Sequence, residues 1–190
     1  MNVYDFDKTI YAGDSSLEFY LYCIKEQPLL LKYIPKQIWG ILFYKLHFVT
    51  KTKMKEQFFS YLKDMRNIDE MIDEFWVLNY HKINIWYMKQ KKEDDIIISA
   101  SPEFLLLPIC QTLNIKSLIA SKVDKYSGKF LSENCYGKMK PIFFRQRFPD
   151  AVVDAFYSDS LTDQPMARLA EKPYFIKNGI PVKWTMEENK

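Results

Sequence analysis

Glycine is scarce in this chain of 190 residues, and its spacing excludes the two common nucleotide-binding loops. The G-x-G-x-x-G turn of dinucleotide-binding folds and the G-x-x-x-x-G-K-[ST] loop of nucleoside triphosphatases both need glycines a few positions apart. The five glycines are more widely spaced: Gly13, Gly40, Gly128, Gly137 and Gly179. The chain therefore carries neither loop.

Cysteine and histidine are also few. The three cysteines, Cys23, Cys110 and Cys135, form no C-x-x-C pair, and His47 and His81 lie far from them in sequence. A disulfide framework or a structural zinc site is not expected, and this cysteine usage fits a reducing cytoplasm. The N-terminus lacks the basic start and apolar run of a signal peptide. We therefore expect a cytoplasmic protein.

No charge of one sign dominates, since 27 lysines and arginines stand against 24 acids and leave a net charge of +3. This balance does not indicate nucleic acid, and no such partner is expected. Residues 29–49 are largely apolar but contain Lys32, Lys36 and Lys45. Because lysines near the centre of a bilayer are unfavourable, we expect no transmembrane span.

The order of the apolar patterns predicts an α/β fold. Residues 15–92 have helical apolar spacing throughout, between a first strand at 2–6 and a β-branched run at 95–98. Further strands are expected at 117–120, 154–157, 174–176 and 182–184, a hairpin at 123–135, and helices from Pro102, near Pro141 and over 166–171. Alternating strands and helices indicate a Rossmann-like, mostly parallel sheet with helices on both faces. The core domain would comprise residues 1–14 and 90–190, with residues 15–89 inserted as an all-helical cap domain.

Four groups of polar residues lie where predicted strands end. They are Asp5-Phe6-Asp7-Lys8-Thr9, Ser99-Ala100-Ser101, Lys138-Met139-Lys140 and Ser158-Asp159-Ser160-Leu161-Thr162-Asp163. Ligands of open α/β sheets bind outside the carboxyl ends of the strands, so these groups can converge on one crevice.

The chemistry of these groups suits a phosphoryl group. Asp5 and Asp7 point the same way in an extended segment, and they repel unless a cation or a shared proton intervenes. Ser101 as an N-cap and Pro102 in the first helical turn would leave Ser99 beside free backbone N–H groups, which bind anions. Acids at the fourth strand end can complete a site for Mg²⁺. A cation and a lysine then offset phosphate charge while a carboxylate attacks.

With these motifs in this order, the sequence resembles the haloacid dehalogenase superfamily, in the branch that includes phosphoserine phosphatase. Asp5, Asp7 and Thr9 match the first motif, and Ser99 matches the second. The third motif is matched by Lys140, with Lys138 as the alternative, and the fourth by Asp159 and Asp163. The inserted helical segment matches the cap of that branch in its location between the first two motifs.

The resemblance implies a two-step phosphoryl transfer. Asp5 would be the nucleophile that forms an aspartyl-phosphate, and Asp7 the general acid and base. Mg²⁺ would be held by the Asp5 carboxylate, the backbone carbonyl of Asp7 and Asp159, while Asp163 would act through a metal water or the lysine. The residues implied to bind the phosphate oxygens are Ser99, Ala100 and Lys140. We therefore expect a Mg²⁺-dependent phosphomonoesterase acting on a small phosphate ester.

Two residues are candidates for recognition of the substrate. Asp14 lies where phosphoserine phosphatases carry a glutamate for the substrate amino group, but aspartate also suits the N-cap of a helix beginning at Ser15. Arg66 is the only arginine of residues 15–89. A cap arginine binds the substrate carboxylate in that branch, so Arg66 is the second candidate.

The charge of the helical segment is skewed. Residues 29–63 hold seven lysines and one acid, Glu56, whereas residues 64–74 hold five acids. A basic, aromatic-rich segment suits an anionic or lipid-like leaving group or a membrane surface, and the plainer interpretation is a solvated lysine face over a helical core. The aromatic residues expected in that core are Tyr33, Trp39, Phe43, Tyr44, Phe48, Phe58 and Phe59.

Two alternative functions remain open. One is a phosphotransferase of the same superfamily, which passes the phosphoryl group to an alcohol rather than to water. The other is a non-catalytic module that binds anionic lipid or RNA through its basic helices. The presence of all four acids together with Ser99 and Lys140 favours an enzyme.

Overall fold

The structure is a computed structural model that describes residues 1–185. A six-stranded sheet forms the centre of the molecule. The strand order is β3-β2-β1-β4-β5-β6, with β6 antiparallel to β5 and the other neighbours parallel. The strands are β1 (Asn2–Tyr4), β2 (Ile96–Pro102), β3 (Ser117–Ser121), β4 (Val153–Ser158), β5 (Ala170–Lys177) and β6 (Ile180–Lys183). The mostly parallel sheet confirms the fold class predicted from the sequence.

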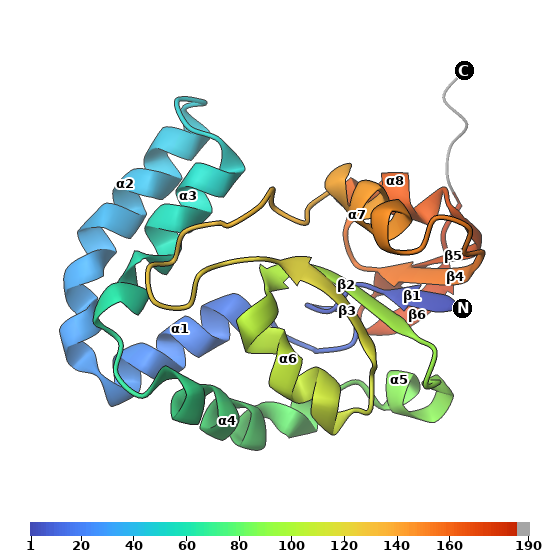
Figure 1. Cartoon of the computed structure of the whole chain (residues 1–190), viewed down its shortest axis with the longest axis horizontal. Helices are drawn as coiled ribbons and strands as arrows, with labels where there is room; N and C mark the ends of the chain where they lie inside the picture. The colour runs from blue at the N-terminus through green and yellow to red at the C-terminus, as the bar shows by residue number, and fades with distance from the viewer. Residues whose placement is uncertain (186–190) are drawn as a thin grey trace.

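Helices cover both faces of this sheet (Figure 1). On one face Val3 belongs to the apolar cluster of Phe144 and Met166, which lie in α7 (Met139–Arg147) and α8 (Gln164–Ala167). On the other face Tyr4 belongs to a larger cluster that includes Leu106 of α6 (Glu103–Thr112). Burial on both faces explains why β2 opens with a continuous rather than an alternating apolar run.

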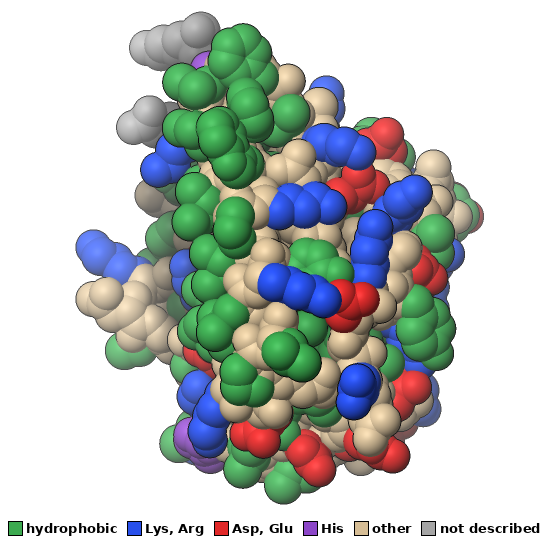
Figure 2. Space-filling view, turned by 90° about the vertical axis from the view of Figure 1, so that its left-hand side faces the viewer, with side chains coloured by type: hydrophobic (Ala, Val, Ile, Leu, Met, Phe, Trp, Pro, Cys, Tyr) green, Lys and Arg blue, Asp and Glu red, His purple; other side chains and the backbone are tan. Residues whose placement is uncertain are grey.

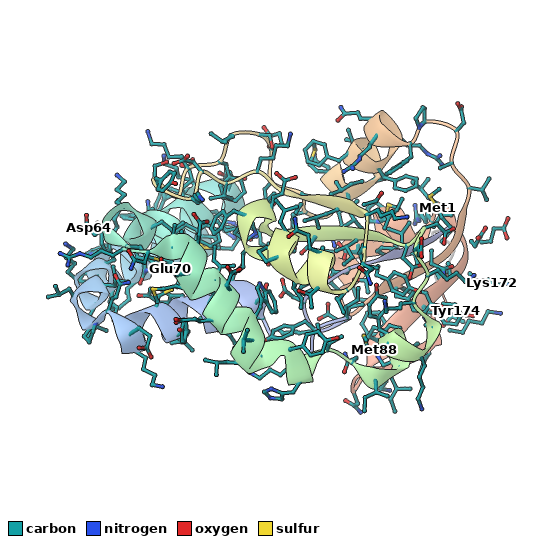
Figure 3. All side chains as sticks on the ribbon, turned by 60° about the horizontal axis from the view of Figure 1, so that its bottom comes forward. Met1, Asp64, Glu70, Met88, Lys172 and Tyr174 are labelled. Carbon is teal, nitrogen blue, oxygen red and sulfur yellow. The ribbon has the colours of Figure 1, made fainter. Side chains whose placement is uncertain are left out.

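The chain between β1 and β2 is helical, as predicted. Its elements are α1 (Ser15–Glu26), η1 (Pro28–Tyr33), α2 (Ile34–Lys45), α3 (Lys51–Phe58), η2 (Phe59–Asp64), α4 (Ile68–Asn79), η3 (Tyr80–Lys82) and α5 (Ile85–Gln90). The segment extends away from the sheet, with α2 and α3 as its outermost hairpin (Figure 1). In Figure 3, Asp64 and Glu70 mark this end of the molecule and Met1 and Lys172 the opposite end. Within residues 1–185, no helix has both the length and the apolar character needed to cross a membrane.

The helical segment shares an apolar core with one face of the sheet. Trp76 of α4 donates its indole N–H to the carbonyl of Leu105 in α6 at 2.7 Å. The Trp76 ring also lies edge-on to Phe6, with 5.7 Å between the centroids. This continuous core fixes the base of the segment directly beside the end of β1.

One predicted element is wrong, and another is shorter than expected. Residues 166–171 do not form one helix, because α8 ends at Ala167 and Ala170 already pairs with Val153 in the sheet. Pairing with β4 there outweighs the helical preference of the local sequence. The hairpin expected at 123–135 is shorter than predicted: Val123 and Phe130 are bridged antiparallel, and the N–H groups of Asp124 and Leu131 donate to the carbonyls of Lys129 and Lys122, at 2.8 Å each. Its turn packs on η2, so closely that a Cβ at Gly128 would lie 2.3 Å from a backbone carbonyl oxygen.

The aromatic residues of the helical hairpin are only partly in the core. Phe59 is buried, whereas Trp39, Tyr44 and Phe48 are exposed. The expectation of a core position is therefore wrong for these three residues. The reason is that α2 packs against the rest of the segment through its buried Gln37 and Gly40 rather than through its aromatic side chains.

Candidate active site

A cavity of about 460 Å³ lies at the carboxyl ends of β1, β2 and β4, between the sheet and the helices α1 and α3. The predicted site residues that line it are Asp5, Asp7, Asp14, Ser99, Ala100, Lys140, Asp159 and Asp163. In the strand order, β1 is the strand from which the chain proceeds to β2 on one side and later to β4 on the other. Such a switch in direction is where open α/β sheets leave room for a ligand.

Lys140 connects two of the four polar groups. Its ammonium donates to Oδ1 of Asp5 and to Oδ2 of Asp163, at 2.6 Å each, and its side chain is 2% exposed. Helix α7 begins at Met139, two residues before Pro141, and places Lys140 in its first turn. Lys138 is exposed and, among the described residues, does not line the cavity. The structure thus brings Lys140, rather than Lys138, to Asp5.

The electrostatics of this cluster follow from its burial. Burial raises the pKa of Asp5, and the charges of Asp163 and Asp7 raise it further, while Lys140 opposes the shift. Burial by itself lowers the pKa of Lys140, but the two carboxylates beside it outweigh that effect and raise the pKa above its usual value. Lys140 is therefore a permanent cation at the base of the cavity, which suits the binding of an anion.

Asp7 is held in a different environment. One carboxylate oxygen accepts the backbone N–H of Ser15 at 2.7 Å, and the other accepts the hydroxyl of Ser101. Burial raises the pKa of Asp7, and the charge of Asp14 adds to this, while the hydrogen bonds from the two serines oppose it. A raised pKa favours the protonated carboxyl group, which is the form that a general acid needs.

Ser101 does not cap a helix, contrary to the sequence-based expectation. Strand β2 continues through Pro102, α6 begins at Glu103, and the side chain of Ser101 is directed to Asp7 instead. Ser99 is buried, and its hydroxyl accepts the N–H of Ser101 at 3.1 Å. The irregular pairing of β2 with β3 between Ser99 and Pro102 turns this segment toward the cavity.

Thr9, in the segment after β1, is hydrogen-bonded to Asp159, in the segment after β4. The Thr9 side chain is buried, and its Oγ1 accepts the backbone N–H of Asp159 at 3.1 Å. This bond holds the end of β4 next to the loop that follows β1. Burial raises the pKa of Asp159, and the nearby cation of Lys8 opposes that shift.

The donors around Asp5 and Asp159 fit a small, hard cation. Among residues 1–185 no three His, Cys, Asp or Glu side chains form a metal-binding group. Two carboxylates and a backbone carbonyl are nevertheless enough protein ligands for Mg²⁺, which commonly keeps several waters. Asp5 and Asp159 line the same cavity, and burial makes the ionised form of both carboxyl groups unfavourable. A cation bound between them would stabilise the two negative charges.

The sequence did not single out the lysines of α3 that reach the cavity. The Lys55 ammonium donates to the carbonyl oxygen of Ala100 at 2.8 Å, and the Lys51 ammonium lies 3.3 Å from the centroid of the Tyr136 ring. Burial, helped by Lys51, lowers the pKa of Lys55 to about 8. The four-residue spacing of these lysines places them on one helix face. Residues 29–63 contain seven lysines, so this spacing alone did not distinguish Lys51 and Lys55 from the others.

The two candidates for substrate recognition differ in position. Asp14 caps α1, because its Oδ1 accepts the N–H of Leu17 at 3.0 Å, and it also lines the cavity. Arg66 lies elsewhere, in an exposed corner where its backbone exchanges hydrogen bonds with the Gln27 side chain. The expectation that Arg66 approaches the site is therefore wrong, because η2 and the following turn carry it away from the cavity.

A sequence model of the family described as haloacid dehalogenase-like hydrolases matches residues 3–168. The chain belongs to this family. The match spans β1 to α8 and includes the eight predicted site residues that line the cavity. It confirms the resemblance inferred from the sequence motifs, and it makes the chain an enzyme of the hydrolase class.

Solved structures share the fold of this haloacid dehalogenase-like hydrolase. A protein of unknown function from Bordetella pertussis Tohama I has a TM-score of 0.74 and 17% identity, covering 91% of this chain and 87% of that one. A phosphoserine phosphohydrolase-like protein from Francisella tularensis subsp. tularensis SCHU S4 has a TM-score of 0.58 and 16% identity, covering 95% and 89%. A probable phosphoserine phosphatase from Vibrio cholerae has a TM-score of 0.59 and 13% identity, covering 90% and 55%. Among curated proteins no match was found.

Proposed function

We propose that this hydrolase is a Mg²⁺-dependent phosphatase that acts on a small phosphate ester, in the reducing cytoplasm that its buried free cysteines suit. The observation that carries the proposal is the contrast between two neighbouring carboxylates. Burial raises the pKa of both, but Asp5 is paired with the Lys140 cation, which opposes the shift, whereas the hydrogen-bond partners of Asp7 are the neutral groups of Ser15 and Ser101. One carboxylate is thereby suited to attack, and the other to carry a proton.

In the first step, a carboxylate oxygen of Asp5 attacks phosphorus and the bond from phosphorus to the ester oxygen breaks. The proton of Asp7 passes to that leaving oxygen, so the product alcohol departs neutral. In the second step, ionised Asp7 takes a proton from water, which attacks the phosphorus and releases phosphate and the free Asp5 carboxylate. A general acid and base of this kind contributes about 10²–10⁴-fold to the rate.

The remaining residues bind and orient the phosphate. Lys140 and the backbone at Ser99 and Ala100 would hold its oxygens. Mg²⁺, held by Asp5, Asp159 and the backbone carbonyl of Asp7, would offset the charge that develops in the transition state. Asp163 would keep Lys140 in place, a role supported by their 2.6 Å contact.

Residues 15–89 would act as the cap that excludes water and selects the leaving group. Lys51 and Lys55 make the α3 side of the cavity positive, while Met54 and Phe58 add apolar surface beside them. These residues favour a leaving group with an anionic or apolar part. Phosphoserine, the substrate named for two proteins of similar fold, is not favoured as substrate here, because Arg66 lies away from the cavity.

The proposal is tested by phosphate release from a panel of esters, including p-nitrophenyl phosphate, phosphoserine and sugar phosphates. We expect release with Mg²⁺ and none with excess EDTA, and restored release when Mg²⁺ is returned. Added glycerol would yield glycerol phosphate if the enzyme is a phosphotransferase instead. Folded protein that binds Mg²⁺ but releases phosphate from no ester would favour the non-catalytic alternative.

A further inference from the structure

Helix α2 turns its apolar side to solvent. With successive residues about 100° apart around a helix, four apolar residues share one side of α2 and the residue that follows it. This α2 face consists of Ile38, Trp39, Leu42 and Leu46, which are 59%, 56%, 43% and 53% exposed. Figure 2 looks onto this end of the molecule and shows apolar side chains gathered along the outer hairpin.

The inner side of α2 is polar and tightly fitted, so the helix cannot turn over. The buried Gln37 accepts a hydrogen bond from the Tyr20 hydroxyl and donates to the carbonyl of Phe58 at 2.9 Å. Gly40 lies so close to α3 that an added Cβ would be 2.4 Å from Oε1 of Gln57. An amphipathic surface helix normally buries its apolar side. In α2 the packing buries the polar side and leaves the apolar side exposed. Exposed apolar patches of this kind mark interaction sites.

Positive charge borders the α2 face. Lys36 and Lys45 are exposed and lie toward its two edges by helical spacing. From Leu29 to Lys55 the sequence contains no aspartate or glutamate. A lysine at the edge of an apolar stripe extends its ammonium group into water while its methylenes rest on the apolar surface.

We propose that the α2 face docks this enzyme on the surface of an anionic lipid bilayer. The apolar side chains would enter the boundary between headgroups and acyl chains, with Trp39 at the depth that tryptophan prefers. The flanking lysines would meet the anionic headgroups. At about 1.5 Å per residue the 12-residue helix is about 18 Å long, shorter than the roughly 30 Å hydrocarbon core, so α2 would lie along the surface.

Charge also argues against a second copy of the chain as the occupant. A two-fold contact would place the same face on both partners and bring their flanking lysines together. An anionic bilayer complements both the apolar stripe and its basic border. The cavity is lined from α3 and not, among the described residues, from α2. Docking and turnover of a soluble ester are therefore separable.

The test is co-sedimentation of the full chain with vesicles of phosphatidylcholine, with and without phosphatidylglycerol. We expect binding that is stronger with phosphatidylglycerol, and a blue shift of tryptophan emission, because Trp39 is the exposed one of the four tryptophans. Trp39→Ser/Leu42→Ser should weaken binding about tenfold or more, since binding scales with inserted apolar area. The matched control Val77→Ser/Leu78→Ser removes exposed apolar residues of α4 and should bind as wild type.

The charge contribution is tested separately. Lys36→Glu/Lys45→Glu should reduce binding to the anionic vesicles several-fold and leave binding to neutral vesicles unchanged. Lys172→Glu/Lys177→Glu, in β5 at the far end of the molecule, is the control (Figure 3). All these variants should hydrolyse p-nitrophenyl phosphate at the wild-type rate, or match its melting temperature if that ester is not turned over. Absence of vesicle binding by wild type, equal binding by the α2-face variant, or a dimer that this variant dissociates would each overturn the proposal.

Discussion

The ammonium of Lys140 lies 2.6 Å from Oδ1 of Asp5, although 135 positions separate the two residues in the chain. The same ammonium bonds Asp163, so one buried cation satisfies two buried carboxylates. Removing the lysine would leave both carboxylates unpaired in a buried site. Lys140 therefore has two effects: it stabilises the buried carboxylates of the folded protein, and it provides positive charge in the cavity.

Asp5→Asn should reduce phosphate release by at least about 10³-fold, because an amide cannot replace the attacking carboxylate. The fold should persist, since the asparagine oxygen can still accept from Lys140. Phosphate release and far-UV circular dichroism check the two parts. Asp150→Asn, at an exposed acid, is the control and should keep full activity. A folded Asp5→Asn protein with near wild-type turnover would remove Asp5 as the nucleophile.

Lys140→Ala should lower activity by about 10²-fold or more, whereas Lys138→Ala should leave it nearly unchanged. Lys140→Ala should also lower the free energy of unfolding by about 3–5 kcal/mol, because it breaks a buried ion-pair cluster. Lys140→Arg keeps the positive charge and serves as the comparison if the alanine variant unfolds. Steady-state kinetics and urea unfolding measure these effects. The opposite ranking of the two alanine variants would show that Lys138 is the functional lysine.

Lys55→Met should raise KM about tenfold for esters with an anionic leaving group, because a charged hydrogen bond to such a group is lost. The change in kcat should be small. Lys53→Met is the matched control, since Lys53 is exposed and pairs with Glu56. Kinetics on a charged and an uncharged ester distinguish the two variants. Equal KM values for wild type and Lys55→Met on the charged ester would exclude this role.

Asp95 should make the stability depend on pH. Burial raises the pKa of this carboxyl group from 3.8 to about 6; one oxygen accepts the N–H of Lys92, and the other has no partner within residues 1–185. The folded state therefore favours the protonated form, and the free energy of unfolding should fall as pH rises from about 4 to about 6, by roughly 3 kcal/mol at most. Asp95→Asn should remove that fall, as urea unfolding across this range would show. A wild-type slope retained in Asp95→Asn would assign it to other groups.

The sequence by itself determined the residues that meet in the cavity. Asp5, Ser99 and Asp159 follow apolar runs that only buried strands explain, and the ends of parallel strands share one edge of a sheet. The spacing of apolar residues likewise predicted a helical segment between the first two strands. These are local signals, set by backbone geometry and burial.

Tertiary contacts decided what local patterns leave open. Ser101 is a good helix cap in isolation, but β2 extends past it and the hydroxyl bonds Asp7 instead. Arg66 and Lys55 are both basic residues of the helical segment, and the path of the chain through η2 directs only Lys55 into the cavity. Helical spacing shows that α2 has an apolar side, but not which way it faces. That depends on the fit of Gln37 and Gly40 against α3, a contact between segments that no single helix encodes.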